Sequence, residues 1–168
     1  MPATYEPIAT TTLGSAAAEI TFSSISSAYT DLRLVVVWQG TQSGSSNNIM
    51  GRFNGDTATN YSNTDLNGSG TAAASNRGTN QTRMNFGFVA STEGTNWGLA
   101  NIDIFNYAGS TNKTVLCAHS YDRNGSGYVQ RNVNLWRSTS AITSITILSN
   151  VNNLAAGTTA TLYGILKA

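Results

Sequence analysis

The feature that most constrains the fold of this chain is a period-two pattern of side chains across residues 97–148. Between Tyr128 and Trp136, aliphatic residues and one arginine share a parity, whereas amide side chains and the terminal tryptophan share the other. Successive side chains of a β-strand point to opposite faces, so this alternation predicts a strand. Segments rich in turn-forming residues separate it from similar stretches. We therefore predict four consecutive strands, at residues 97–107, 113–121, 128–136 and 142–148.

Further strands are predicted on both sides of this block. Residues 32–39 carry apolar side chains on both parities, so we expect the centre of this strand to be covered on both faces. Residues 5–13 contain Pro7, which cannot donate to a β-ladder, and this favours an edge strand or an N-terminal arm spanning residues 2–13. Other strands are expected at 16–22, 49–54, 84–90 and 158–166.

The expected fold is therefore all-β. About ten strands and no helix longer than a turn or two predict one β-sandwich domain over residues 1–168, with a jelly roll as the favoured topology. Residues 55–81 are polar and contain the turn pair Asn67-Gly68, so we expect a long irregular loop there. Loops of that length often make contacts or bind ligands, although a plain surface loop is the simpler interpretation.

Charge and composition exclude several classes of partner. Only 10% of the residues are charged, against about a quarter in typical globular chains, and the net charge is +1. The cations are scattered, which argues against a nucleic-acid site and against a polybasic membrane anchor. No apolar run approaches the ~20 residues of a membrane-spanning helix. The first residues lack a basic region followed by an apolar one, so we expect no secretion signal there. We expect synthesis in a reducing cytoplasm.

No set of residues in the sequence predicts catalysis, a cofactor or a metal. His119 is the only histidine and Cys117 the only cysteine, and we expect both to be structural, the cysteine buried. The densest group of oxygen side chains is Asn54, Asp56, Asn60 and Asp65. Two aspartates at this spacing do not match a calcium loop, so we expect turn hydrogen bonds there. The three tryptophans and seven tyrosines suit a core or a subunit interface, or a platform that stacks on sugars.

Four segments, at residues 4–13, 52–62, 135–147 and 156–165, resemble a group of small β-sandwich proteins of tailed bacteriophages, including cyanobacterial phages. The resemblance implies a virion structural protein, specifically a capsid decoration (cement) protein on the outer capsid surface with the major capsid protein as its partner. A tail-fibre or tailspike module that binds a cell-surface glycan is the alternative. An enzyme acting on polysaccharide is the third and weakest hypothesis, because no paired carboxylates are evident.

Partner contacts are expected at the N-terminal segment and on one strand face. Residues 2–13 are nearly uncharged and could add to a sheet edge of the capsid protein, with Tyr5, Pro7, Ile8 and Leu13 as contact residues. Trp136 is expected on an exposed outer face of its strand. Together with the apolar parities of residues 32–39, this exposure predicts self-association. The resemblance to decoration proteins, which gather on capsid symmetry axes, favours a homotrimer.

Overall fold

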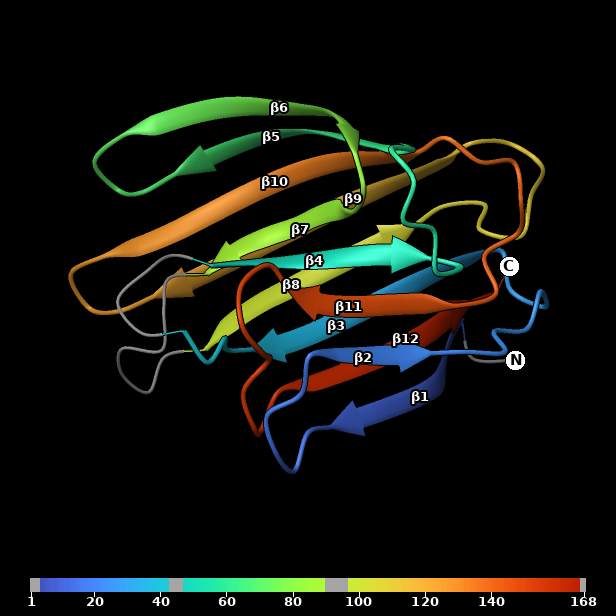
Figure 1. Cartoon of the computed structure of the whole chain (residues 1–168), viewed down its shortest axis with the longest axis horizontal. Helices are drawn as coiled ribbons and strands as arrows, with labels where there is room; N and C mark the ends of the chain where they lie inside the picture. The colour runs from blue at the N-terminus through green and yellow to red at the C-terminus, as the bar shows by residue number, and fades with distance from the viewer. Residues whose placement is uncertain (1–3, 43–46, 90–96, 167–168) are drawn as a thin grey trace.

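The computed structural model describes residues 4–42, 47–89 and 97–166. Within these residues the chain forms two antiparallel sheets that pack face to face, and it forms no helix (Figure 1). The eight-stranded large sheet has the order β1-β12-β3-β8-β9-β10-β5-β6, and the four-stranded small sheet has the order β2-β11-β4-β7. The strands are β1 (Tyr5–Thr12), β2 (Glu19–Phe22), β3 (Asp31–Trp38), β4 (Asn47–Phe53), β5 (Tyr61–Gly68), β6 (Ala73–Gln81), β7 (Met84–Val89), β8 (Gly98–Ile104), β9 (Lys113–Asp122), β10 (Gly127–Trp136), β11 (Ile145–Ser149) and β12 (Thr159–Ile165). The predicted all-β sandwich is confirmed.

The strands pair in a nested way. β1 pairs with β12, β2 with β11, β3 with β8 and β4 with β7. We call these eight strands the frame. The remaining strands β9, β10, β5 and β6, which we call the extension, continue the large sheet beyond β8. Figure 1 shows that β5 and β6 stand beyond β7, the edge strand of the small sheet.

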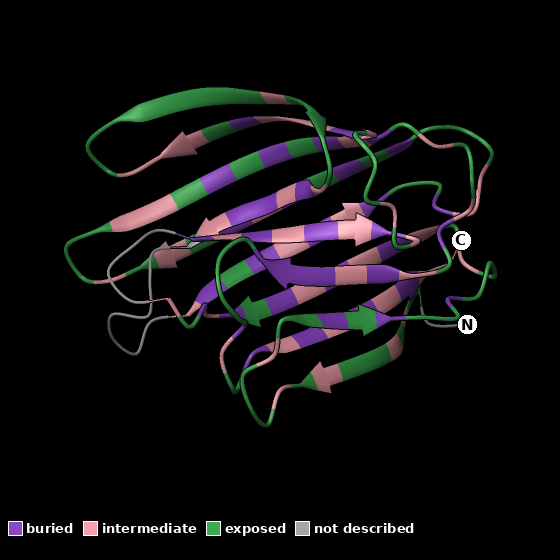
Figure 2. Ribbon diagram, viewed as in Figure 1, coloured by how far each residue is buried: buried purple, intermediate pink, exposed green. Residues whose placement is uncertain are grey.

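The frame holds the apolar core. Along β3, Leu32, Leu34, Val36 and Trp38 alternate inward and are fully buried. Opposing strands of the small sheet contribute aromatic and aliphatic side chains, and Figure 2 shows the resulting alternation of buried and exposed residues along the frame strands. Each fully buried side chain of this size stabilises the fold by roughly 1.5–3 kcal/mol relative to exposure.

Two predictions need correction, one about the faces of β3 and one about the loop at residues 55–81. The centre of β3 is not covered on both faces within one chain, because Val35 is half-buried and Val37 is 41% exposed. Residues 55–81 are not one long loop, because they contain β5 and β6. These two strands lack apolar alternation, since β6 is solvent-exposed along nearly its whole length (Figure 2). Cross-strand pairing forms them instead, of β5 with β10 and of β6 with β5.

The N-terminal segment is the first strand of this sandwich and its edge. β1 pairs with β12 from Tyr5 to Thr12, with a register shift at Ile8. Pro7 sits in this edge strand, as its missing N–H requires. Of the two alternatives for residues 2–13, the structure therefore contains the edge strand; residues 2 and 3 lie outside the described residues.

Candidate functional site

The outer face of the large sheet, meaning the side that points away from the small sheet, exposes aliphatic side chains from five strands. These are Val37, Leu66, Leu99, Leu116, Val129 and Val133, each 38% to 62% exposed. The strand register places them in adjacent rows: Val37 lies opposite Leu99, and Leu116 opposite Val133. Contiguous apolar surface of this kind marks interaction sites in soluble proteins.

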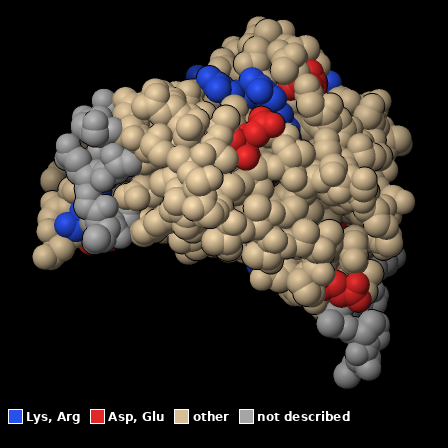
Figure 3. All heavy atoms as spheres, turned by 60° about the horizontal axis from the view of Figure 1, so that its bottom comes forward, with Lys and Arg blue, Asp and Glu red and all other residues tan. Residues whose placement is uncertain are grey.

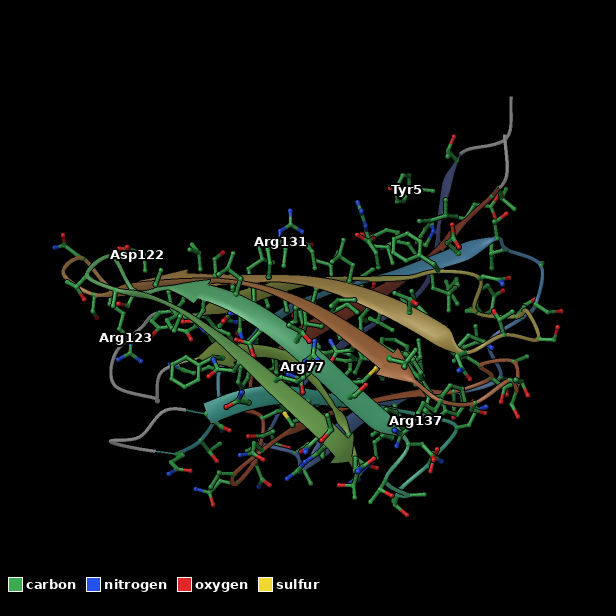
Figure 4. All side chains as sticks on the ribbon, turned by 90° about the horizontal axis from the view of Figure 1, so that it is seen from above. Tyr5, Arg77, Asp122, Arg123, Arg131 and Arg137 are labelled. Carbon is green, nitrogen blue, oxygen red and sulfur yellow. The ribbon has the colours of Figure 1, made fainter. Side chains whose placement is uncertain are left out.

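A shallow hollow of about 440 Å³ lies within this outer face. Leu66, Leu99, Ala118 and Val129 line it, together with Arg131. In Figure 4, Arg131 projects from the side of the large sheet opposite β4. Arg131 forms no ion pair with any described residue. The hollow therefore offers an apolar floor with one cation beside it.

Arg33 and Asp103, which lie on the outer face near β1, form an ion pair. Nε of Arg33 lies 2.6 Å from Oδ1 of Asp103, and the hydrogen bonds to this carboxylate raise the pKa of Arg33. The same guanidinium lies 5.5 Å from the centre of the Tyr5 ring. Because this ion pair is already formed, a partner surface covering this part of the outer face would displace little charge from water. Figure 3 views the molecule from the side of β1 and the small sheet, where charged side chains are also few.

The structure separates the five residues expected to contact a partner. Tyr5 and Pro7 are exposed, and their pairing with β12 places them on the outer face. Ile8 and Leu13 are partly buried and pack against the core of the same chain. Trp136 is 2% exposed.

The expected exposure of Trp136 is wrong. Its indole Nε1 donates to Oδ2 of Asp56 at 2.7 Å, and its ring packs against Phe53 and Tyr61. Burial tends to raise the pKa of Asp56, but hydrogen bonds from Asn60, Trp136 and the Ala58 amide outweigh it, so that pKa is lowered. On β10 the aliphatic parity faces outward and the parity of the amides and the tryptophan faces inward.

A second candidate surface, the amide cleft, lies between β7 of the small sheet and the extension. It has a volume of about 390 Å³. Most of its lining residues are polar, and five of them carry carboxamides. The lining residues are Asn48, Asn63, Asp65, Asn76, Arg77, Gly78, Asn85, Phe88, Tyr128 and Gln130. Because these residues come from segments far apart in the sequence, the sequence analysis did not predict the cleft.

Hydrogen bonds hold the walls of the amide cleft in place. Nδ2 of Asn132 and Nδ2 of Asn134 each donate to the backbone oxygen of Asn85 at 2.9 Å. The Asn85 amide donates in return to Oδ1 of Asn134 at 3.1 Å. On the opposite wall, Oδ1 of Asp65 accepts hydrogen bonds from Asn67 and Asn76, at 3.0 and 3.1 Å.

One buried side-chain oxygen of the cleft lining has no hydrogen-bond partner within the described residues. Gln130 is 6% exposed, and its Oε1 accepts no hydrogen bond from any described residue. Oδ1 of Asn132, a residue next to the cleft lining on β10, is likewise buried and without a hydrogen-bond partner among the described residues. The aromatic rings of Phe88 and Tyr128, with centroids 4.8 Å apart, form an apolar wall of the same cleft.

Cys117 and His119 are both buried, as was expected of the cysteine. Burial raises the pKa of the Cys117 thiol, which disfavours the reactive thiolate. Burial also lowers the pKa of His119 to about 4, and Nε1 of Trp38 donates to its Nε2 at 3.4 Å. The imidazole packs on Gly87, where an added Cβ would lie 2.2 Å from its Cγ. The described residues contain no group of three or more His, Cys, Asp or Glu side chains able to hold a metal ion.

Comparison with known proteins found no family model, no curated protein and no solved structure that matches this chain. Among the described residues, no helix is long and apolar enough to cross a membrane.

Proposed function

We propose that this chain is a capsid decoration protein of a tailed bacteriophage, which forms a homotrimer through the outer face of its large sheet and binds the major capsid protein. The observation that carries the proposal is the contiguous aliphatic surface across β3, β8, β9, β10 and β5. A single chain leaves this surface in water, and covering it gains roughly 25 cal/mol per Å² of apolar area. The resemblance of four segments to phage β-sandwich proteins is the reason for proposing that the protein belongs to a virion.

Packing against other copies suits the chemistry of the outer face. The only ion pair found among the described residues, Arg33 with Asp103, is already formed within one chain. A partner copy therefore needs few matching charges, namely acceptors for Arg131 and for Arg77, whose partner Thr64 has the outward parity of β5. Apolar, weakly charged contact surfaces of this kind are typical of homo-oligomer interfaces.

Edge strand β1 is the proposed contact with the capsid protein. One side of β1 pairs with β12, and the other side has no neighbour in the large sheet as described. An exposed sheet edge can accept a strand of a partner through main-chain hydrogen bonds, without charge. This attachment should therefore depend only weakly on salt.

The nested pairing of strands supports a finer inference about the fold. With the hairpins β5–β6 and β9–β10 set aside, the frame strands alternate between the sheets as the two Greek keys of a jelly roll do. We therefore infer a jelly roll enlarged by the extension.

The direct test of the virion role is the copy number of this protein in purified particles, measured by quantitative mass spectrometry. A decoration protein is expected at a number comparable with that of the major capsid protein. A handful of copies in the tail fraction would contradict the proposal and favour the tail-fibre alternative. A glycan-binding role would fall to the amide cleft, on the opposite side of the large sheet.

A second experiment tests attachment through β1. Thr10→Pro removes a main-chain donor from the edge strand, and Thr139→Ala in an exposed loop is the control. After melting curves confirm folding, co-sedimentation with capsids that lack the protein should be reduced for the first variant only. Full binding of the folded Thr10→Pro variant, or release of the wild type by moderate salt, would contradict attachment through β1.

A further inference from the structure

The amide cleft remains open in an assembly formed through the outer face, because it lies on the inner side of the large sheet. Its floor is the inward parity of β10 and β5, and β7 forms its other wall. In Figure 4 the ribbons of β5 and β6 lie beside β10, and Arg77 is at this end of the sheet. A ligand could therefore enter beside the extension without disturbing the trimer.

The cleft contains polar groups that the fold itself does not satisfy. Gln130 is more than nine-tenths buried, lines the cleft, and has an Oε1 without a hydrogen-bond partner among the described residues. Asp65 is 5% exposed, and only its Oδ1 accepts hydrogen bonds from described residues. Buried polar groups normally have partners, so unsatisfied ones that line a cleft point to a ligand.

The charges and donors of the cleft define the class of ligand. Asp65 and Arg77 are the only charged residues of the lining. Arg77 pairs with Thr64, which has the outward parity of β5, so the Asp65 carboxylate is the charge that faces the cleft. An anion would meet the Asp65 carboxylate, and a metal ion would find a single carboxylate where it needs several. A carboxamide both donates and accepts hydrogen bonds, as a sugar hydroxyl does.

The aromatic wall completes this chemistry. Phe88 and Tyr128 lie together at one side of the cleft, with ring centroids 4.8 Å apart. Aromatic faces pack against apolar surface and leave the polar tip of a tyrosine available for hydrogen bonding. A pyranose ring presents apolar C–H groups on its faces and hydroxyl groups around its rim. We propose that the amide cleft binds a neutral saccharide, with Asp65, Asn76 and Gln130 holding hydroxyl groups and Phe88 with Tyr128 packing on the ring.

The test is titration of the full-length protein with neutral hexose oligomers, namely malto-, manno- and galacto-oligosaccharides, at up to about 10 mM, well above the millimolar affinity of a weak ligand. Heteronuclear NMR follows the side-chain carboxamides of Asn76 and Gln130. At least one neutral oligomer should shift both signals, whereas inorganic phosphate and an oligogalacturonate, tested in parallel, should not.

Two variants locate the site. Asp65→Asn keeps the shape of the side chain, and Asn76→Ala removes an exposed amide from β6. Each should weaken binding of the responding oligomer about tenfold, the effect of losing one or two hydrogen bonds. Ser75→Ala is the matched control, because Ser75 is the exposed neighbour of Asn76 and pairs with Leu66 of the outer face.

The outcomes distinguish the inference from its competitors. Absence of any shift with all three neutral oligomers would overturn it, as would equal binding by wild type, Asp65→Asn and Asn76→Ala when melting curves show that the variants fold. A response to phosphate or oligogalacturonate alone would replace the neutral saccharide by an anion. None of these results bears on the outer face, so the proposed decoration role stands or falls separately.

Discussion

The frame and the extension contain strands of one continuous sheet, yet the inner faces of the frame strand β3 and the extension strand β10 differ. On the frame strand β3 the inward side chains are Leu32, Leu34, Val36 and Trp38. On the extension strand β10 they are Gln130, Asn132, Asn134 and Trp136. The difference follows from what lies opposite. The small sheet covers the frame, whereas the extension is covered mainly by the edge strand β7, with Phe53 of β4 packing on Trp136 (Figure 1).

The uncovered edge of β7 explains why asparagines are buried on β10. An edge strand presents unpaired N–H and C=O groups that need partners. On β7, the backbone N–H and C=O of Asn85 are bound by the side chains of Asn132 and Asn134. The amides of the extension therefore do at this edge what a fifth strand of the small sheet would do, and the same arrangement leaves the amide cleft beside them.

The largest effect should come from the inner face of the frame. Leu34→Ala removes a fully buried side chain and is expected to cost about 2–5 kcal/mol of the free energy of unfolding. Val37→Ala, on the outer face of the same strand, is the matched control and should cost less than half as much in a monomeric sample. Chemical denaturation measures both, and equal losses would mean that the two faces of β3 are not distinguished by burial.

A pH-dependent effect should follow from His119, at the junction of frame and extension. The folded pKa is lowered to about 4 from 6.5, so between these values the unfolded chain binds the proton and the folded chain does not. The stabilisation is complete above pH 6.5 and is lost as pH falls toward 4, by up to about 3 kcal/mol. Denaturation at several pH values, with His119→Gln as the control, measures this loss. An NMR titration midpoint near 6.5 in the folded protein would contradict it.

The extension should respond more moderately. Asn134→Ala leaves the Asn85 amide without its acceptor and removes one of two donors to the Asn85 oxygen, at an expected cost of about 1–3 kcal/mol. In the variant, hydrogen exchange of the Asn85 amide should be faster than in the wild type, and this acceleration should be larger than that of the amides in the core strand β3. Asn150→Ala, at an exposed turn, is the control. An unchanged exchange rate at Asn85 would show that β7 does not depend on β10.

Alternation within single strands could be predicted from the sequence, and the faces of the sandwich could not. The expected strand at 128–136 matches β10 (Gly127–Trp136) closely, because period-two patterning is a local property. Which parity faces inward depends on the opposite sheet, and so the aliphatic side of β10 and Trp136 were placed on the wrong faces. The polar strands β5 and β6 were missed for a related reason: the pairing of β5 with β10 is remote in sequence, and β6 pairs only with β5. The lining of the amide cleft also comes from segments that are remote in sequence, so no local pattern predicts it.

The smallest effect should come from the charged pair on the outer face of the frame. Arg33→Gln breaks the ion pair with Asp103, whose side chains are 37% and 21% exposed. Pairs this accessible to water contribute about 0.2–1 kcal/mol, so the melting temperature should hardly change. A loss comparable with that of Leu34→Ala would mean that the outer face is much less accessible than the structure indicates.

The most direct test of the assembly role is the mass of the protein in solution, measured by sedimentation equilibrium at about 50 µM, a concentration that reports micromolar association. The wild type is predicted to be a trimer. Val129→Asp places a charge in the outer face and should give a folded monomer, whereas Val151→Asp, at an exposed valine outside that face, should remain a trimer. A monomeric wild type, or a Val129→Asp variant that is still a trimer, would contradict assembly through the outer face.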